Sequence, residues 1–168
     1  MRLSAMRGDI TTLKTDAIVN AANDRLLPGG GVCGAIHAVA GPKLAEECDR
    51  LGGCPTGEAR LTRGYGLPAG HVIHAVAPIW QGGSRGEAGL LAACYRAIAR
   101  IVRQKRFRTI AIPAIGTGIY GYPIEAATHI AVTTMAAETS DLPGEATFVC
   151  FRDSDLAIYQ TELQSLRT

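Results

Sequence analysis

The amino-acid sequence predicts an α/β protein folded as a three-layer α/β/α sandwich. Short apolar runs rich in isoleucine and valine alternate along the chain with longer segments of helical periodicity. Three of the short runs, Ala17–Asn20, Val72–Ala77 and Thr109–Pro113, are almost wholly apolar. Strands of this kind are covered on both faces, so helices are expected on each side of the sheet.

Each element follows from its local pattern. The expected strands are short apolar or alternating runs: Leu3–Arg7, Ala17–Asn20, Ala59–Gly64, Val72–Ala77, Thr109–Pro113 and Thr147–Phe151. The expected helices have apolar residues three and four positions apart: Val32–Val39, Lys43–Leu51, Glu87–Val102, Ile124–Thr139 and Asp155–Gln164. Gly41-Pro42 separates the first two helices, and Asp153-Ser154-Asp155 supplies N-cap candidates for the last helix.

Length and composition predict a single domain over residues 1–168, because no repeat or linker divides the chain. The net charge of +2 is too weak and dispersed for a nucleic-acid partner, although it suits a small polyanion. No apolar run is long enough to cross a bilayer, and no secretory leader is recognisable. The five cysteines are odd in number and irregularly spaced, which favours free thiols. We therefore expect a cytoplasmic, monomeric protein.

Two glycine-rich loops each lie between an apolar strand and a helix. Gly29–Gly34 follows Asn20-Ala21-Ala22-Asn23, and Gly116–Gly121 follows the strand that ends near Pro113. Glycine lets a backbone turn with positive φ and present N–H groups to an anion, and a following helix adds its positive end. Glycines in one loop would indicate only a tight turn, but two loops at equivalent strand ends predict a diphosphate site.

Read together, the motifs resemble the macrodomain family, closest to its ADP-ribosylhydrolase branch, from Gly8 to about Tyr159. The motifs that carry the resemblance are Gly8-Asp9-Ile10-Thr11, Asp16–Asn23, Gly29–His37, Cys54–Ala59, Gly64–Ala69, His71–His74 and Ile112–Pro123. The resemblance implies a central six-stranded mixed sheet with an ADP-ribose cleft over its strand ends. It also implies that ADP-ribose or ADP-ribosylated proteins are the partners and that neither cofactor nor metal is needed.

The resemblance assigns the adenine end of the ligand to two residues. Asp9, with Ile10 beside it, matches the carboxylate that accepts a hydrogen bond from the adenine amino group. The alternative role for Asp9 is to cap the turn Ile10–Leu13, and both roles are compatible. Phe151 matches the aromatic residue that packs against adenine, and the alternative is ordinary core packing.

The resemblance assigns the diphosphate and the distal ribose to the two glycine loops and their neighbours. Tyr120 matches the aromatic residue over the distal ribose, and Asn23 matches the amide that hydrogen-bonds the ribose hydroxyls. Asn20 belongs to the same motif, or alternatively satisfies backbone groups in the turn. The remaining ligand-binding residues are Gly30, Gly31, Val32, Gly116, Thr117, Gly118 and Ile119.

Cys33 departs from the hydrolase pattern, which usually has aspartate at this position. A neutral thiol does not replace the charge of a carboxylate, and acid–base assistance is commonly worth about 10²–10⁴-fold in rate. Three roles are open: slow hydrolysis with Asn23 and Cys33 as the catalytic residues, binding without catalysis, or a nucleophilic pair between Cys33 and His37.

A structural zinc site and an unrelated nucleotide-phosphate enzyme are two further hypotheses. Cys48, Cys54, His71 and His74 lack the paired spacing of a structural zinc site. An unrelated nucleotide-phosphate enzyme would recruit a lysine and metal-binding carboxylates, which the loops do not offer. An ADP-ribosylhydrolase, acting on esters of ADP-ribose with Asp or Glu or on O-acetyl-ADP-ribose, is therefore favoured over a non-catalytic ADP-ribose reader.

Overall fold

The computed structural model describes residues 1–168 and contains every strand and helix expected above. The strands are β1 (Arg2–Arg7), β2 (Ala17–Ala22), β3 (Ala59–Arg63), β4 (His71–Val76), β5 (Thr109–Pro113) and β6 (Glu145–Cys150). The helices are the short 3-10 helix η1 (Ile10–Thr12), α1 (Gly31–Ala40), α2 (Pro42–Leu51), α3 (Glu87–Lys105), α4 (Ile124–Thr139) and α5 (Asp153–Ser165). No helix combines the length and hydropathy needed to span a membrane.

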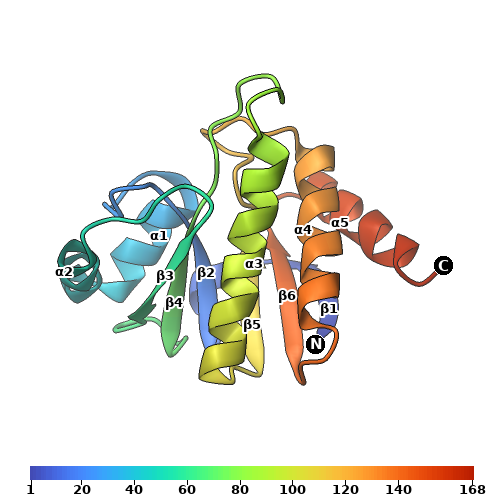
Figure 1. Ribbon diagram of the computed structural model, residues 1–168. Coiled ribbons are helices and arrows are strands. Elements are labelled where there is room, and N and C mark those ends of the chain that lie inside the picture. The colour runs from blue at the N-terminus through green and yellow to red at the C-terminus, as the bar shows by residue number, and fades with distance from the viewer.

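The six strands form one mixed sheet in the order β1-β6-β5-β2-β4-β3 (Figure 1). Every neighbouring pair is parallel except β3 with β4, which is antiparallel. The carboxyl ends of the five parallel strands therefore meet at one edge of the sheet. The predicted sandwich with a six-stranded mixed sheet is confirmed.

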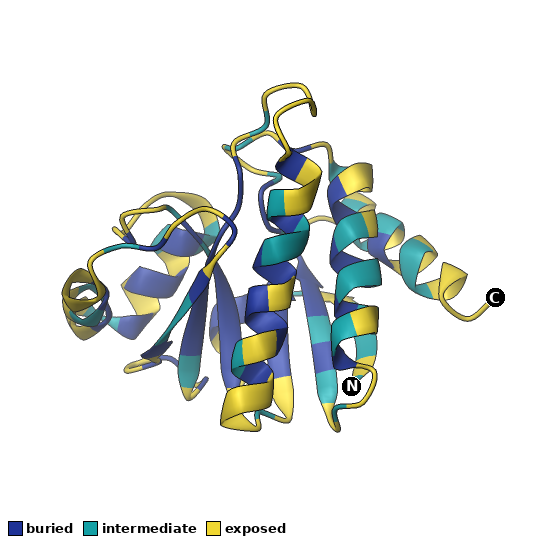
Figure 2. Ribbon diagram, viewed as in Figure 1, coloured by how far each residue is buried: buried dark blue, intermediate teal, exposed yellow.

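Helices cover both faces of the sheet. One buried cluster joins the sheet to α3, α4 and α5, and a second joins its other face to α1 and α2. Strand β2 shows why: Ala17 and Val19 belong to the first cluster, and Ile18 and Ala22 to the second. Successive side chains of a strand point to opposite faces, so an apolar strand must be covered twice. Figure 2 shows the central strands buried between these layers.

The residues at the N-termini of α2 and α5 explain where these two helices begin. Gly41 has φ of 86° between α1 and α2, and Pro42 occupies the first turn of α2, as its fixed φ and missing N–H favour. The expected N-cap of α5 is wrong, because the helix already begins at Asp153 and Arg152 precedes it. Asp153 and Asp155 instead lie in its first turn, where carboxylates favourably meet the helix dipole.

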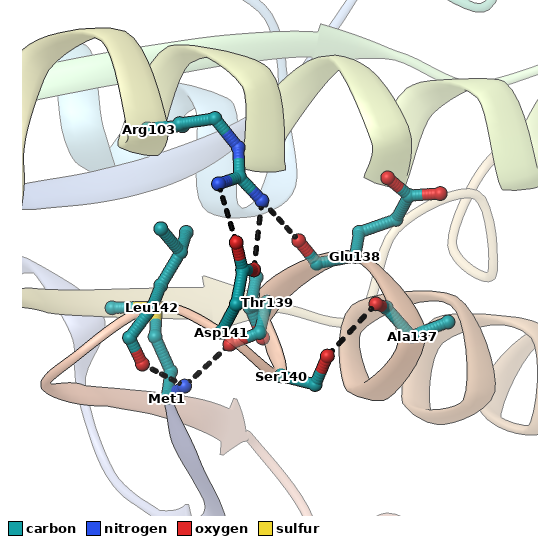
Figure 3. Close-up of polar contacts among 8 residues, drawn as sticks. All are labelled: Met1, Arg103, Ala137, Glu138, Thr139, Ser140, Asp141 and Leu142. Carbon is teal, nitrogen blue, oxygen red and sulfur yellow. Dashed lines mark hydrogen bonds and ion pairs between the residues drawn. The ribbon is translucent and has the colours of Figure 1, made fainter.

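The amino terminus lies at the edge of the sheet opposite the strand carboxyl ends (Figure 1) and is held there by hydrogen bonds (Figure 3). The amino group of Met1 donates to the carbonyl oxygens of Thr139 and Leu142. Beside them, Arg103 of α3 forms a bidentate ion pair with Asp141, with N–O distances of 2.8 and 2.9 Å. These contacts tie the edge strand β1 to the layer of α3 and α4.

Candidate functional site

A cleft of about 1060 Å³ lies over the carboxyl ends of the parallel strands. Its walls are the loops that follow β1, β6, β5 and β2, in the spatial order of those strands. Neighbouring strands lie about 4.8 Å apart, so the three gaps from β1 to β2 span roughly 15 Å. This length suits an extended ligand with chemically distinct parts along it.

The structure brings all but one of the predicted site residues onto the wall of this cleft. The lining residues that the sequence predicted are Asp9, Ile10, Asn23, Gly30, Gly31, Val32, Cys33, Gly116, Thr117, Gly118, Ile119, Tyr120 and Phe151. The exception is Asn20, which lies beneath the cleft. Residues more than 140 positions apart therefore share one site because their strands are neighbours in the sheet.

Asp9 is oriented by its neighbour Thr11 at the β1 end of the cleft. Its Oδ1 accepts from the Thr11 backbone N–H at 2.9 Å and from the Thr11 hydroxyl at 2.7 Å. The first of these bonds caps η1, as the alternative reading expected. The Thr11 hydroxyl and backbone hydrogen bonds lower the pKa of Asp9. The carboxylate thus stays charged, and Oδ2 is left to accept from a ligand.

Phe151 lies just beyond β6 rather than within it, and its side chain is not part of the core. The residue is 86% exposed, so the core-packing alternative for Phe151 is wrong. A ring this exposed leaves a face free beside Asp9 in the same cleft. A carboxylate acceptor beside a free aromatic face is an arrangement suited to an amino-bearing base.

The first glycine loop ends in the N-terminus of α1. Gly30 precedes the helix without a side-chain cap, and Gly31 has φ of 57°. The N–H groups of Gly31, Val32 and Cys33 have no partner within the protein. A helix start with free donors and a positive dipole end is an anion site.

The second glycine loop faces the first across the cleft. Its ends are closed by bonds from Gly121 N to Gly118 O and from Tyr122 N to Gly116 O, of 3.0 and 2.9 Å. The four intervening N–H groups, from Thr117 to Tyr120, have no partner within the protein. Ile119 is 90% exposed, and its side chain would lie 4.0 Å from a Cβ at Gly30, so the two loops approach each other here.

Asn23 lies where β2 runs into the first loop, and its side chain organises that loop. Its Nδ2 donates to the Leu27 carbonyl at 2.8 Å, and its Oδ1 accepts from the Leu27 N–H at 3.0 Å. One amide hydrogen and one lone pair remain for a ligand. This donor and acceptor, side by side on the cleft wall, suit a pair of neighbouring hydroxyl groups.

Asn20 is a correction to the sequence prediction. The residue is 1% exposed within β2 and does not line the cleft, so it is not placed to contact a ligand. It also bonds no backbone group, because its Nδ2 faces His74 Nδ1 at 3.1 Å and Cys33 Sγ at 3.6 Å. Asn20 is buried because β2 is covered on both faces, and it lies in the floor of the cleft.

Cys33 and His37 do not form the nucleophilic pair considered above. The thiol of Cys33 contacts Asn20 and the Leu27 carbonyl, at 3.6 and 3.7 Å, and not the imidazole. His37 is buried on α1 with its Nδ1 unpartnered, and burial lowers its pKa. Of the residues considered as zinc ligands, Cys48 and His74 do approach each other, with Sγ 3.7 Å from Nε2. No three His, Cys, Asp or Glu side chains gather as a metal set.

The structure adds support residues that the sequence did not reveal. Glu87 is buried at the start of α3 and accepts from the backbone N–H groups of Gln81, Gly83 and Arg85, at 2.6–2.9 Å. These bonds shape the loop that follows Trp80, whose own N–H donates to Tyr120 O at 2.8 Å. Trp80 thus anchors this loop to the second glycine loop, and Glu87 indirectly supports the cleft.

Glu87→Gln is expected to lower the Tm at pH 7, because the three N–H groups use both carboxylate oxygens and glutamine has only one acceptor oxygen. Those bonds hold the pKa of Glu87 at about 2, below its ordinary 4.5. The contribution of the carboxylate is therefore present above pH 4.5 and is lost as the pH falls toward 2. The Tm difference from wild type should shrink below pH 4.5. Glu58→Gln, at an exposed carboxylate, is the control, and a pH-independent difference would contradict the assignment.

His74 also gives a pH-dependent prediction. Burial, with His37 nearby, lowers the pKa of His74 to about 4, whereas an unfolded chain titrates near 6.5. Between these values the unfolded state binds the extra proton, so stability falls as the pH drops from 6.5 to 4, by up to about 3 kcal/mol. Urea unfolding should show a shallower pH slope for His74→Gln and the wild-type slope for His129→Gln, whose imidazole is exposed. Equal slopes in all three proteins would refute this.

Arg152 and Asp155 also line the base end of the cleft and were not predicted. Their side chains pair at 3.4 Å across the first turn of α5. The acidic run Asp153-Ser154-Asp155 was interpreted as a helix cap, so its place beside Phe151 was missed. The packing of α5 against α4, β1 and β6 brings Asp155 to the cleft.

Together, the sandwich and its cleft define an α/β/α domain with an extended cleft, which offers a carboxylate beside a free aromatic face, two sets of free N–H groups and a free amide edge. The Macro domain family matches residues 19–131, and the chain belongs to this family. It is 56% identical to a macro domain-containing protein of Chlorobaculum tepidum, over 96% of this chain and 95% of that protein. It is 48% identical to the O-acetyl-ADP-ribose deacetylase of Enterobacter cloacae, over 95% and 92%.

The solved structures agree with this assignment. A mutant of the Oceanobacillus iheyensis macrodomain, solved with ADPR, superposes with a TM-score of 0.94. The two chains are 41% identical, and the match covers 98% of this chain and 93% of that one. At this identity the likeness covers the sequence as well as the fold.

Proposed function

We propose that this protein binds ADP-ribose along the cleft and hydrolyses esters at its distal ribose. One observation carries the proposal: the order of chemical groups along the strand ends matches the order of groups in ADP-ribose. Asp9 and Phe151 suit adenine, the two facing sets of free N–H groups suit the diphosphate, and Asn23 with Tyr120 suits the second ribose. The relative solved with ADPR supports the same ligand.

In the proposed reaction, water attacks the ester and yields free ADP-ribose and the released acid. Binding energy from the adenine and diphosphate ends holds the reacting ribose in place, as catalysis by positioning requires. Asn23 orients the ribose hydroxyls, and the loops fix the diphosphate against which the water is placed. We propose that no metal takes part, and turnover should be unchanged by EDTA.

The substrate class is an acyl ester of ADP-ribose: O-acetyl-ADP-ribose, or ADP-ribose linked to Asp or Glu of a protein. The relative from Enterobacter cloacae is named for the first of these substrates, O-acetyl-ADP-ribose. The exposed side chain of Ile119 lies beside Tyr120 on the second glycine loop, so the distal-ribose end of the cleft leaves room for a protein-linked substrate. We further propose that the protein acts as a monomer in the cytoplasm, where its five free cysteines stay reduced.

A non-catalytic reader is the second candidate, and one observation favours it. Cys33 places a neutral thiol, bonded only to Asn20 and Leu27, where a charged group would assist a water molecule. A reader would bind ADP-ribose as tightly but release nothing from an ester. Turnover therefore separates the two candidates, and binding does not.

Binding is tested by thermal shift against ADP-ribose, ATP, AMP and NAD at equal concentrations. A ligand that binds the folded state raises the Tm in proportion to RT ln(1 + [L]/Kd). We expect ADP-ribose to raise the Tm most, because it alone fills the base, diphosphate and sugar positions without excess groups. A larger shift with ATP or NAD would contradict the proposed ligand.

A further inference from the structure

A chain of buried polar contacts runs beneath the cleft, from β3 to the first glycine loop. Thr62 Oγ1 lies 2.9 Å from His74 Nε2, and His74 Nδ1 lies 3.1 Å from Asn20 Nδ2. Asn20 Nδ2 lies 3.6 Å from Cys33 Sγ, which is 3.7 Å from the Leu27 carbonyl oxygen. Thr62, His74 and Asn20 are each at most 2% exposed. Three adjacent strands thus connect to the cleft floor through side chains alone.

The donors in this chain have one consistent direction. Asn20 Nδ2 carries only hydrogens, so His74 Nδ1 must accept, and the neutral ring then carries its proton on Nε2. That proton goes to Thr62 Oγ1 at 2.9 Å, the nearer of its two neighbours, since Cys48 Sγ lies 3.7 Å away. The Thr62 hydrogen reaches the Arg63 carbonyl at 3.2 Å. The second Asn20 hydrogen goes to Cys33 Sγ, which leaves the thiol hydrogen for the Leu27 carbonyl. The low pKa of His74 agrees with a neutral ring.

Leu27 joins this chain to the ribose-facing amide. Its carbonyl oxygen accepts from both Cys33 Sγ and Asn23 Nδ2, and its N–H donates to Asn23 Oδ1. Both polar atoms of Asn23 are therefore oriented by the peptide groups of one residue. Gly29 packs beside them, because a Cβ there would lie 3.7 Å from Asn23 Nδ2 and 3.9 Å from Cys33 Sγ.

Packing alone does not account for asparagine at position 20. Its neighbours in β2 are apolar, and its own Oδ1 is buried without a partner. An unpaired buried carbonyl is unfavourable, and an apolar side chain of similar size would avoid it. The two bonds that its Nδ2 makes, to His74 and Cys33, are what asparagine provides here.

We propose that Asn20, itself held by His74, is a positioning residue for Asn23 and acts through the Cys33 thiol and the Leu27 carbonyl. This inference rests on the proposed function, because Asn23 is the residue assigned to the distal ribose. It also gives Cys33 a role without charge or nucleophilic attack. The thiol accepts a hydrogen bond from Asn20 in the buried strand and donates one to Leu27 in the loop. The residue that the sequence marked as a possible ligand contact therefore acts from below the cleft.

The kinetic test measures kcat and KM for O-acetyl-ADP-ribose with Asn20→Ala, Cys33→Ala and the double variant. Each single variant is expected to lower kcat about tenfold or more and to change KM less than about threefold. Because both act through the same contacts, the double variant should be within about twofold of the slower single variant. Cys33→Ser, which can still donate and accept, should lose less kcat than Cys33→Ala. Thr139→Val, at a buried hydroxyl far from the cleft, is the control for a general loss of stability.

Multiplicative losses in the double variant, or an Asn20→Ala kcat equal to that of Thr139→Val, would overturn the proposal.

A spectroscopic test needs no turnover. Asn20 and Asn23 are the two asparagines of the chain, so asparagine-selective ¹⁵N labelling gives two side-chain amide signals. In Asn20→Ala the remaining Asn23 signal should shift and broaden, whereas in Thr139→Val it should not.

The His74 ring offers a check on the wild-type protein, which remains valid if Asn20→Ala fails to fold. Its ¹⁵N shifts should show protonated Nε2 and unprotonated Nδ1, and the opposite tautomer would overturn the donor direction. Absence of turnover in wild type would refute the proposed hydrolysis alone. An Asn23 amide signal unaffected by Asn20→Ala would refute the positioning role alone. The two failures are therefore distinguishable.

Discussion

Asn23→Ala is expected to reduce kcat for O-acetyl-ADP-ribose by about 100-fold or more. Two effects combine in this variant. The ribose loses the amide hydrogen and lone pair that orient its hydroxyls, and the loop loses both bonds between Asn23 and Leu27. Misplacement of a reacting group by about 1 Å can cost about 100-fold in rate. Steady-state kinetics with the purified variant measures the loss directly.

Binding of ADP-ribose to Asn23→Ala should weaken far less, because the adenine and diphosphate contacts are unchanged. We expect the Kd to rise by about tenfold, as for the loss of one or two neutral hydrogen bonds. Gln160→Ala, which removes an exposed amide on α5, is the matched control and should behave as wild type. A kcat for Asn23→Ala within threefold of wild type would exclude Asn23 from the catalytic machinery.

Asp9→Ala is expected to weaken ADP-ribose binding by about 10- to 100-fold. The variant removes a hydrogen bond to a charged acceptor, which is commonly worth about 1.5–3 kcal/mol. The wild-type carboxylate accepts from Thr11 on Oδ1 alone, so its other oxygen is available to the adenine amino group. Isothermal titration calorimetry of wild type and variant gives the ratio of the two Kd values.

Base selectivity tests the same assignment more sharply. The inosine analogue of ADP-ribose has a carbonyl in place of the adenine amino group, so its oxygen would face the Asp9 carboxylate. Wild type should reject this analogue, and Asp9→Ala should bind both ligands with similar affinity. Asp153→Ala removes a nearby exposed carboxylate that is paired with Arg7 and should keep wild-type selectivity. Wild-type binding of the inosine analogue as tight as that of ADP-ribose would contradict the role of Asp9.

The elements of this fold were predictable because the hydrophobic pattern determines them locally. The boundaries of β5 and α4 were predicted without error, and the largest difference is three residues at the end of α3. There the helix continues through Arg103 and Lys105, whose polar side chains gave no apolar signal. The sequence predicts that the acidic residues Asp153 and Asp155 cap α5, whereas in the structure they lie in its first turn.

The cleft wall was predictable from loops that follow strands, but its support was not. The glycine loops and Asn23 carry their chemistry in local sequence, whereas Asn20 depends on contacts with residues 13 and 54 positions away. Glu87 likewise reads as one acidic residue at a helix start, and only the fold of the preceding loop buries it. Contacts between distant segments leave no periodic signal, so these roles required the structure.

The most direct test of this account is release of ADP-ribose from a protein mono-ADP-ribosylated on Asp or Glu, with wild-type enzyme in excess. We predict first-order release that reaches completion, is unaffected by EDTA and collapses in Asn23→Ala. The contradicting result is tight binding of ADP-ribose without release by wild type, together with release by Cys33→Asp. That outcome would make the protein a reader of ADP-ribose whose cleft lacks one carboxylate for catalysis.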